Sequence, residues 1–427
     1  MLAPPLVINI PFQPLTIAFL AALAVQLALK VWLARRQLHH VRAHRGEVPA
    51  AFAGAITPEQ HRKAADYTAA RTRFGFVALA VSTVVLLLWT LIGGIQWLDT
   101  GWRTLGLNVY FTGVGVMLSV ALISALIDLP LSIYSTFRLE ARFGFNKSTP
   151  ATFVADLIKG TVLALVIGAP LAFLALWLMA RTGRWWWLAV WALWIGFALL
   201  MTWAYPAFIA PLFNKFRPLD DAALRDRLTA LLARCGFSSK GVFVMDGSRR
   251  SAHGNAYFTG IGRNKRIVFF DTLMESLGGA EIEAVMAHEL GHFRLHHVKI
   301  RLAMTALLGL GGFALLGWLA AQPWFYHGLG VSVPSNHAAL ILFALVAPVF
   351  MFPLTPLFSW LSRRHEFAAD HYATEQADGA ALASGLVTLY RDNSTTLTPD
   401  PLHSGFYDSH PPAIIRISRL KPRSAQD

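Results

Sequence analysis

Two histidines and one glutamate of this sequence lie within five consecutive residues, in the order His288-Glu289-Leu-Gly-His292. At about 3.6 residues per turn, the two histidines lie one above the other on the same face of a helix. Imidazoles at that spacing can bind one zinc ion, and the neighbouring carboxylate of Glu289 can reach a water on that ion. Hydrolysis needs an open position for this water and a base that takes its proton. The segment predicts a hydrolytic zinc site with Glu289 as the base, although two surface histidines on an amphipathic helix would have the same spacing.

A catalytic zinc site uses three protein ligands, so a third ligand is expected elsewhere in the chain. Glu366 and Asp370 are four residues apart in a helical pattern and share a face. One carboxylate that binds zinc and a second that hydrogen-bonds a ligand histidine are typical of such sites. A solvated helix after a membrane span has the same pattern, but the histidine motif favours the metal interpretation. We expect Cys235 to be an inert packed residue, and His296 and His297 to be solvated or, at most, to contact a ligand.

The elements that hold these residues belong to a membrane protein. The chain has 427 residues, of which 55% are hydrophobic and only 14% charged, whereas about a quarter of the residues in soluble domains are charged. Its single cysteine excludes an intrachain disulfide. A membrane helix needs about 20 apolar residues. The uncharged runs of this length predict seven spans. The last run is long enough for two of them, which a turn-rich break at 326–336 separates. These runs cover residues 1–29, 74–98, 104–127, 161–180, 185–214 and 302–362.

The basic residues predict how the spans are oriented. Of 37 Lys and Arg residues, 34 lie in four segments that alternate with loops holding few or none. Short basic loops stay in the cytoplasm, so the N-terminus is expected outside and the C-terminus inside. The formal charge of +13 then reflects topology and contact with the lipid bilayer, and we expect no nucleic-acid partner. Because Lys30 follows the first apolar run, that run is expected to be an uncleaved span and not a signal peptide.

The polar segments divide the chain into four parts. Residues 1–213 are predicted to hold spans 1–5 with basic cytoplasmic loops, and residues 301–362 to hold spans 6 and 7. Residues 214–300 and 363–427 are expected to form the two halves of one domain. The predicted fold class is an all-α polytopic membrane protein with a small α+β zincin-like metalloprotease domain on the cytoplasmic side.

A candidate substrate-binding edge precedes the histidine motif. Residues 256–260 and 266–270, joined by a turn at 262–265, are typical of a β-hairpin. The edge strand of such a hairpin can pair with an extended peptide through its backbone. Tyr257, within this strand, is therefore a candidate substrate-binding residue. Asn255 lies just before the strand and, taken by itself, is a common turn former.

Several segments together resemble the type I CAAX prenyl proteases, which are integral-membrane zinc metalloproteases of the gluzincin class. The resemblance covers most of the chain and implies seven helices around a water-filled chamber, with one zinc ion per chain. Besides the histidine motif and the Glu366 helix, it is carried by residues 129–147, 209–216, 253–260 and 407–412, together with Arg416.

The resemblance also implies a role for each candidate residue. It implies that His288, His292 and Glu366 bind zinc and that Glu289 is the base. Asp370 corresponds to the carboxylate that hydrogen-bonds a ligand histidine. Asn255 and His410 correspond to the two residues beside the scissile peptide. A histidine beside the scissile bond can donate a hydrogen bond to the oxyanion that forms when water attacks. Without the resemblance, His410 would be a residue that starts a helix before Pro411-Pro412.

These features predict a membrane-embedded zinc endopeptidase that acts on membrane-associated or CAAX-type C-terminal peptides. No motif in the sequence indicates recognition of a prenyl group, and the Ala-, Arg- and Trp-rich composition suggests a bacterial inner-membrane protein. General cleavage of membrane proteins is therefore as well supported as CAAX processing. The alternatives are a smaller stress-type membrane metalloprotease and a non-enzymatic seven-span transporter or receptor. Asp128, Asp156 and Lys159 are expected to line a cavity or to pair, with Lys159 extending to the membrane interface.

Overall fold

The computed structural model describes residues 13–237, 241–259 and 266–420. In this part of the chain, seven helical segments are long and apolar enough to cross a membrane, which confirms the predicted number of spans. The segments run Pro14–Ala43 (α1), Pro58–Trp89 (α2), Val109–Phe143 (α4 and α5), Pro150–Arg181 (α6), Gly183–Phe213 (α7 and α8), His297–Leu319 (α12) and Asn336–Gln376 (α14 and α15). Residues 1–12 of the first predicted span and the C-terminal residues 421–427 lie outside the described residues.

Three of these segments are compound. The first two contain a π-helical turn, which shifts the side chains that follow it around the helix. The first consists of α4 (Val109–Tyr134), the turn Ser135–Glu140 and α5 (Ala141–Phe143), and the second of α7 (Trp186–Ala204), the turn Tyr205–Ile209 and α8 (Ala210–Phe213). The third joins α14 (Asn336–Met351) to α15 (Thr355–Gln376). The shorter helices are α3 (Gly94–Arg103), α9 (Ala222–Arg234), α10 (Asp271–Ser276), α11 (Gly279–Arg294), α13 (Pro323–His327), α16 (Gly379–Asp392), α17 (Pro401–Tyr407) and α18 (Ala413–Leu420).

The boundaries of α2 differ clearly from the predicted span 74–98. The helix begins earlier because Thr57 caps it: the Thr57 hydroxyl accepts from the Gln60 amide at 3.2 Å, and the Gln60 side chain accepts from the Thr57 amide at 2.8 Å. It ends at Trp89, and α3 starts after Gly93, whose φ of 84° lies in the left-handed region. An uncharged run therefore locates this span but not its ends.

A four-stranded sheet lies beside the long helices, in the order β1-β2-β4-β3. Its strands are β1 (Phe216–Pro218), β2 (Val242–Met245), β3 (Ala256–Thr259) and β4 (Arg266–Phe270). β2 and β4 are parallel, and β3 pairs antiparallel with β4, with Ala256 opposite Phe269. The predicted hairpin is thus confirmed in its two strands, while its turn at 262–265 lies outside the described residues. Because β3 pairs on one side only, it is an edge strand.

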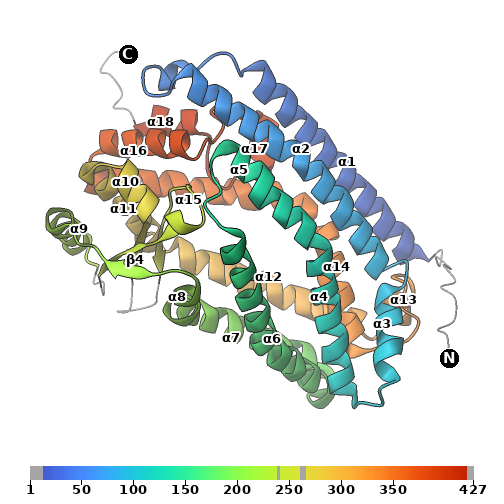
Figure 1. Ribbon diagram of the computed structural model, residues 1–427. Coiled ribbons are helices and arrows are strands. Elements are labelled where there is room, and N and C mark those ends of the chain that lie inside the picture. Colours follow the sequence, from blue (N-terminus) through green and yellow to red (C-terminus); the bar gives the residue numbers. More distant parts are fainter. Residues whose placement is uncertain (1–12, 238–240, 260–265, 421–427) are drawn as a thin grey trace.

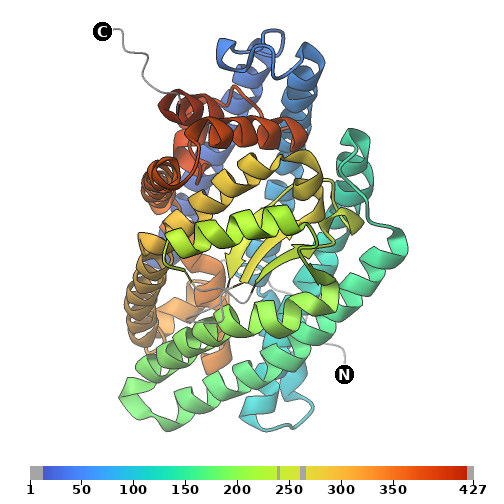
Figure 2. The same cartoon turned by 90° about the vertical axis from the view of Figure 1, so that its left-hand side faces the viewer.

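The sheet and the short helices share one hydrophobic core with the last part of the chain. Leu228 of α9, Phe269 of β4 and Met286 of α11 are all but fully buried, and they lie in one cluster with Leu382 of α16 and Leu420 of α18. Figures 1 and 2 show these elements gathered at one end of the long helices, with α3 and α13 at the other end. Segments that two spans separate in sequence therefore pack together.

Two polar contacts lie near the end of the long helices where the sheet packs. The Arg250 guanidinium donates to both carboxylate oxygens of Asp156 in α6, at 2.7 and 2.9 Å, and to the Asn214 side chain at 3.0 Å. The ammonium of Lys159 donates to the Leu212 carbonyl at 2.8 Å. Asp156 is thus paired, as ionisable groups of membrane helices usually are, and Lys159 holds the end of α8.

Candidate metal centre and the cavity beside it

The helix that carries the histidine motif packs closely on α15. It starts with a side-chain cap, since the Gly278 amide donates to Glu281 at 2.8 Å. Gly291, between the two histidines, lies against α15 so closely that a Cβ there would be 3.1 Å from the Cα of Ala369 and 3.2 Å from its carbonyl oxygen. The missing side chain therefore brings the histidine face of α11 to the face of α15 that carries Glu366.

Three side chains meet between these helices. The Nε2 atoms of His288 and His292 are 3.2 Å apart, and Glu366 places its carboxylate oxygens 3.5 and 3.3 Å from them. Ligand atoms on a tetrahedral zinc ion, each about 2.0–2.2 Å from the metal, are roughly 3.3 Å apart. Glu366 Oε2 is buried without a hydrogen-bond partner in the part of the chain that the structure describes. The donor set and its spacing therefore fit a zinc ion.

Asp370 lies behind the His288 ring. His288 Nδ1 is 2.8 Å from Asp370 Oδ1, and the Arg416 guanidinium donates to both oxygens of the same carboxylate at 2.8 and 2.5 Å. All of these side chains are buried. Burial acts to lower the pKa of His288, but Asp370 and Glu366 outweigh it and raise the pKa to about 9. Glu366 and Asp370 carry two negative charges, and Arg416 supplies one positive charge. A further positive charge at the His288 ring is therefore favourable, and a bound metal cation would supply it.

The His292 ring has a different neighbour. Its Nδ1 is 3.0 Å from Nδ1 of His297, whose ring stacks on His365 with 4.1 Å between centroids and 10° between planes. His297 is only 8% exposed, so of the two expectations for this residue, a solvated side chain or contact with a ligand, the structure agrees with the second. His296, next to it, is exposed as expected. His297 therefore contacts a ligand histidine from behind.

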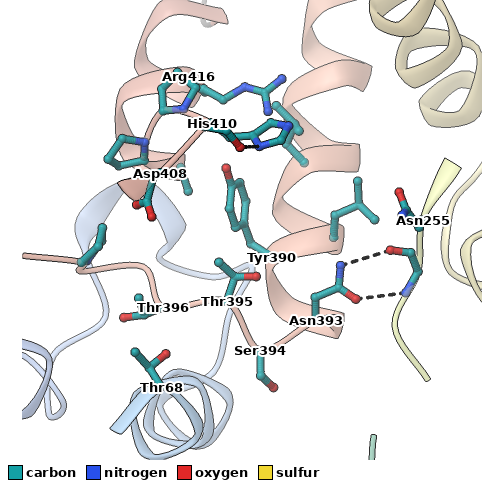
Figure 3. A pocket seen from close by; sticks show the side chains of 18 of the residues that line it. Thr68, Asn255, Tyr390, Asn393, Ser394, Thr395, Thr396, Asp408, His410 and Arg416 are labelled. Carbon is teal, nitrogen blue, oxygen red and sulfur yellow. Dashed lines mark hydrogen bonds between the residues drawn. The ribbon is translucent and has the colours of Figure 1, made fainter. Parts of the chain in front are cut away.

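A cavity of about 800 Å³ opens next to these residues. Figure 3 shows Asn255 on one wall, His410 and Arg416 on another, and Thr68 of α2 below. Asn393, at the end of α16, holds the Asn255 wall in place: it donates to the Gly254 carbonyl at 3.2 Å and accepts from the Gly254 amide at 3.0 Å. Glu289 lines the same cavity, so its carboxylate faces the space that a substrate would occupy.

His410 approaches the metal centre from this cavity. Its Nε2 is 3.5 Å from a carboxylate oxygen of Glu366, and its side chain is 61% exposed. The Ser409 hydroxyl lies 3.0 Å from His410 Nδ1, and Arg363 donates to the preceding carbonyl, that of Asp408, at 2.8 Å. The loop before Pro411-Pro412 is thus held so that an accessible imidazole faces the cavity.

The structure does not bring Tyr257 to this cavity. Its hydroxyl is 4.0 Å from the sulfur of Met245, its ring packs edge-on against Phe270, and it lines a separate pocket beside Pro206 and Arg266. Successive side chains of a strand face opposite sides, so the proposed substrate-binding role of Tyr257 has no support in its position. Sequence reasoning missed Asn393 and Tyr390, which also lines the cavity, because neither belongs to a metal-ligand pattern.

Known proteins resemble this chain over nearly its whole length. Residues 37–215 match the family described as CAAX prenyl protease N-terminal, five membrane helices, and residues 218–424 match peptidase family M48. The CAAX prenyl protease 1 homolog of Arabidopsis thaliana is 33% identical over 96% of this chain and 98% of its own length. CAAX prenyl protease 1 of Saccharomyces cerevisiae is also 33% identical, over 96% of each chain.

Structural similarity agrees with these matches. The crystal structure of S. mikatae Ste24p superposes with a TM-score of 0.88 at 30% identity, covering 96% of this chain and 100% of that one. A seven-helix membrane protein with a small sheet is therefore the fold of both. The relatives named here are from a plant and from yeasts, so they give no support to the bacterial origin that the composition suggested.

Proposed function

The chain belongs to the CAAX prenyl proteases of peptidase family M48, and from this premise we propose that it is a zinc-dependent membrane endopeptidase. One observation carries the proposal: His288, His292 and Glu366 each offer one ligand atom within 4.8 Å of the other two, and the two Nε2 atoms are 3.2 Å apart, as two ligands of a tetrahedral zinc ion are. Glu289 follows directly on the first ligand and lines the adjoining cavity. A metal centre open to a cavity on one side is what a hydrolytic site needs.

The side chains divide the chemistry between them. Zinc, when bound by the two histidines and Glu366, supplies a Lewis acid that polarises the scissile carbonyl and activates a water. Glu289 takes the proton of that water and passes it to the leaving amine. The exposed imidazole of His410 is placed to donate a hydrogen bond to the oxyanion. Asn255 precedes the edge strand β3, whose backbone can pair with an extended peptide.

The long helices are proposed to enclose a water-filled chamber. Asp128 of α4 is exposed and makes no ion pair within the described ranges. An unpaired carboxylate on a membrane helix needs water, so this face of α4 is assigned to the chamber. The basic segments support a cytoplasmic position for the catalytic residues and an external N-terminus.

The substrate class is proposed to be the C-terminal segments of membrane-associated proteins. The relatives are named CAAX prenyl protease 1, and the cavity of about 800 Å³ has room for a short extended peptide. Its lining is mixed, with polar residues such as Thr68, Ser394 and Asp408 beside apolar ones such as Leu386 and Leu389. Such a lining suits a peptide, whose backbone is polar and whose side chains can be apolar.

Metal analysis and one substitution test the proposal. The purified protein should contain about one tightly bound zinc per chain. Glu289→Gln should keep this zinc and lose peptide hydrolysis by about 100-fold or more, because the amide has the shape of the carboxylate but cannot take a proton. A protein without bound zinc, or a variant with near-normal turnover, would contradict the proposal. A non-enzymatic transporter would give the first of these results.

A further inference from the structure

The two ligand histidines are supported by chemically different groups. His288 has a carboxylate behind its Nδ1, since Asp370 Oδ1 is 2.8 Å away and is paired with Arg416. His292 has a second imidazole behind its Nδ1, that of His297 at 3.0 Å. The first arrangement was expected from the sequence; for the second, the sequence allowed at most that His297 contacts a ligand, without indicating which one.

The tautomer that His292 must adopt as a zinc ligand follows from its geometry. Its Nε2 faces the other two ligand atoms, 3.2 Å from His288 Nε2 and 3.3 Å from Glu366 Oε1. A neutral imidazole that binds a metal through Nε2 carries its hydrogen on Nδ1. That hydrogen points at His297 Nδ1, which must then be an acceptor, so the hydrogen of the His297 ring lies on Nε2.

We propose that His297 is the positioning residue of His292: it accepts the Nδ1 hydrogen and thereby fixes the tautomer and the ring orientation in which Nε2 binds zinc. The inference rests on the proposed zinc function. Groups behind a ligand histidine orient its ring and strengthen it as a ligand. Because His297 is neutral when it accepts, it adds no third negative charge to a centre that already holds Glu366 and Asp370.

The backbone between the two helices makes this contact possible. On one continuous helix, residues five apart would point roughly 140° away from each other, so His292 and His297 could not meet. His296 interrupts the helix with a φ of 59°, and α12 begins directly after it. The first side chain of α12 consequently turns back toward α11, where it is 8% exposed and stacked on His365 of α15.

Three variants of the full-length protein separate the acceptor from its surroundings. His297→Phe keeps a ring that can stack on His365 but has no acceptor. His297→Asn places a carbonyl oxygen near the position of Nδ1. His296→Asn is the matched control, because asparagine tolerates the left-handed backbone and the exposed His296 side chain makes no hydrogen bond or ion pair among the described residues.

The readouts are zinc affinity, measured by competition with a chelator, and the visible spectrum of the cobalt-substituted protein. His297→Phe should weaken zinc binding about 10–100-fold and shift the cobalt bands, since one ligand ring is no longer oriented. His297→Asn should restore most of the affinity, and His296→Asn should match the wild type. If His297→Phe does not fold, His297→Leu takes its place with the same expectation.

Two results would overturn the inference. Wild-type zinc affinity and an unchanged cobalt spectrum in His297→Phe would show that His292 needs no acceptor. A His297→Asn variant as weak as His297→Phe would show that the ring itself, and not its acceptor, matters. In both cases the wild type still binds zinc and hydrolyses peptide, so the proposed function stands; a wild type that binds no zinc would remove both.

Discussion

At the scale of single residues, removing one ligand and removing one substrate-binding group should have different effects. Glu366→Ala should lose zinc as well as activity, because two imidazoles hold zinc weakly in a site built for three ligands. His410→Ala should keep its zinc and lose turnover by about 100-fold, because it would touch only the oxyanion. Metal analysis and peptide cleavage of both purified variants distinguish the roles, with His371→Ala, exposed on the same helix as Glu366, as the control.

The opposite metal contents would reverse these assignments. Full zinc in Glu366→Ala would show that Glu366 is not a ligand, and zinc loss in His410→Ala would make that histidine a ligand.

The spacing of residues along the sequence predicts those site residues that lie close together on the same helix. His288 and His292 share a helix face, as do Glu366 and Asp370, and the helical repeat alone predicts each pair. The contact of His297 with His292 depends on the left-handed backbone of His296, which no spacing rule anticipates. Asn393 reaches the cavity wall through its contact with Gly254, in the loop before β3, and nothing in its neighbouring sequence indicates this.

At the scale of elements, the contact between α11 and α15 depends on a glycine. Gly291→Ala would place a Cβ 3.1 Å from the Cα of Ala369, and a backbone atom cannot turn aside as a side chain can. The helices should therefore move apart by a few tenths of an ångström and carry Glu366 away from the histidines. We expect weaker zinc binding and a lower melting temperature, measured by chelator competition and thermal unfolding.

A matched substitution shows whether position matters. Gly311→Ala in α12, where a new Cβ would meet nothing within 4 Å, should change neither quantity. Equal behaviour of the two variants would contradict the role given to the close helix contact.

A second element-level prediction concerns the contact between α1 and α17. Asp400 is buried, caps α17 through the His403 amide at 2.9 Å and receives two hydrogen bonds from Arg36 of α1 at 3.3 and 2.9 Å. Burial acts to raise the pKa of Asp400, but these donors outweigh it and hold the pKa below its usual value. The stabilising effect is therefore present above the unfolded pKa of about 3.9 and is lost as the pH falls through the lower folded value.

Asp400→Asn should accordingly lower the melting temperature at pH 7, and the difference from the wild type should shrink as the pH falls below about 4. Thermal unfolding in detergent across this range measures both. Asp378→Asn is the control, since Asp378 is an exposed cap of α16 without an ion pair in the described part of the chain. A difference that stays constant with pH would show that Asp400 acts through shape alone.

Sequence reasoning located the spans and the β3–β4 hairpin but not the ends of helices. The apolar run 74–98 marks where α2 can meet lipid, whereas its true start is set by the capping pair Thr57 and Gln60. Its end is set by the turn at Gly93. Hydropathy indicates whether a helix is surrounded by lipid or by water. The capping residues that determine where the helix begins and ends are polar and lie outside the apolar run.

At the scale of the whole molecule, the distribution of basic residues predicts which ends of the helices face the cytoplasm. In a Cys235→Ala background, which removes the only native cysteine, Arg45→Cys should be labelled only after the membrane is opened. His327→Cys, at the exposed last residue of α13, should react with an impermeant reagent from outside. Labelling of both from the same side would overturn the span count or the orientation.

The separation of the metal ligands along the chain has a consequence for biosynthesis. His288 and His292 emerge from the ribosome before α12 and α14, and Glu366 emerges after them. A zinc site that needs all three side chains cannot close until this pair of helices has been inserted and has returned the chain to the same side of the membrane. The enzyme would therefore be inert as a nascent chain, and the first moment at which it could cut a peptide would coincide with the completion of its own membrane topology.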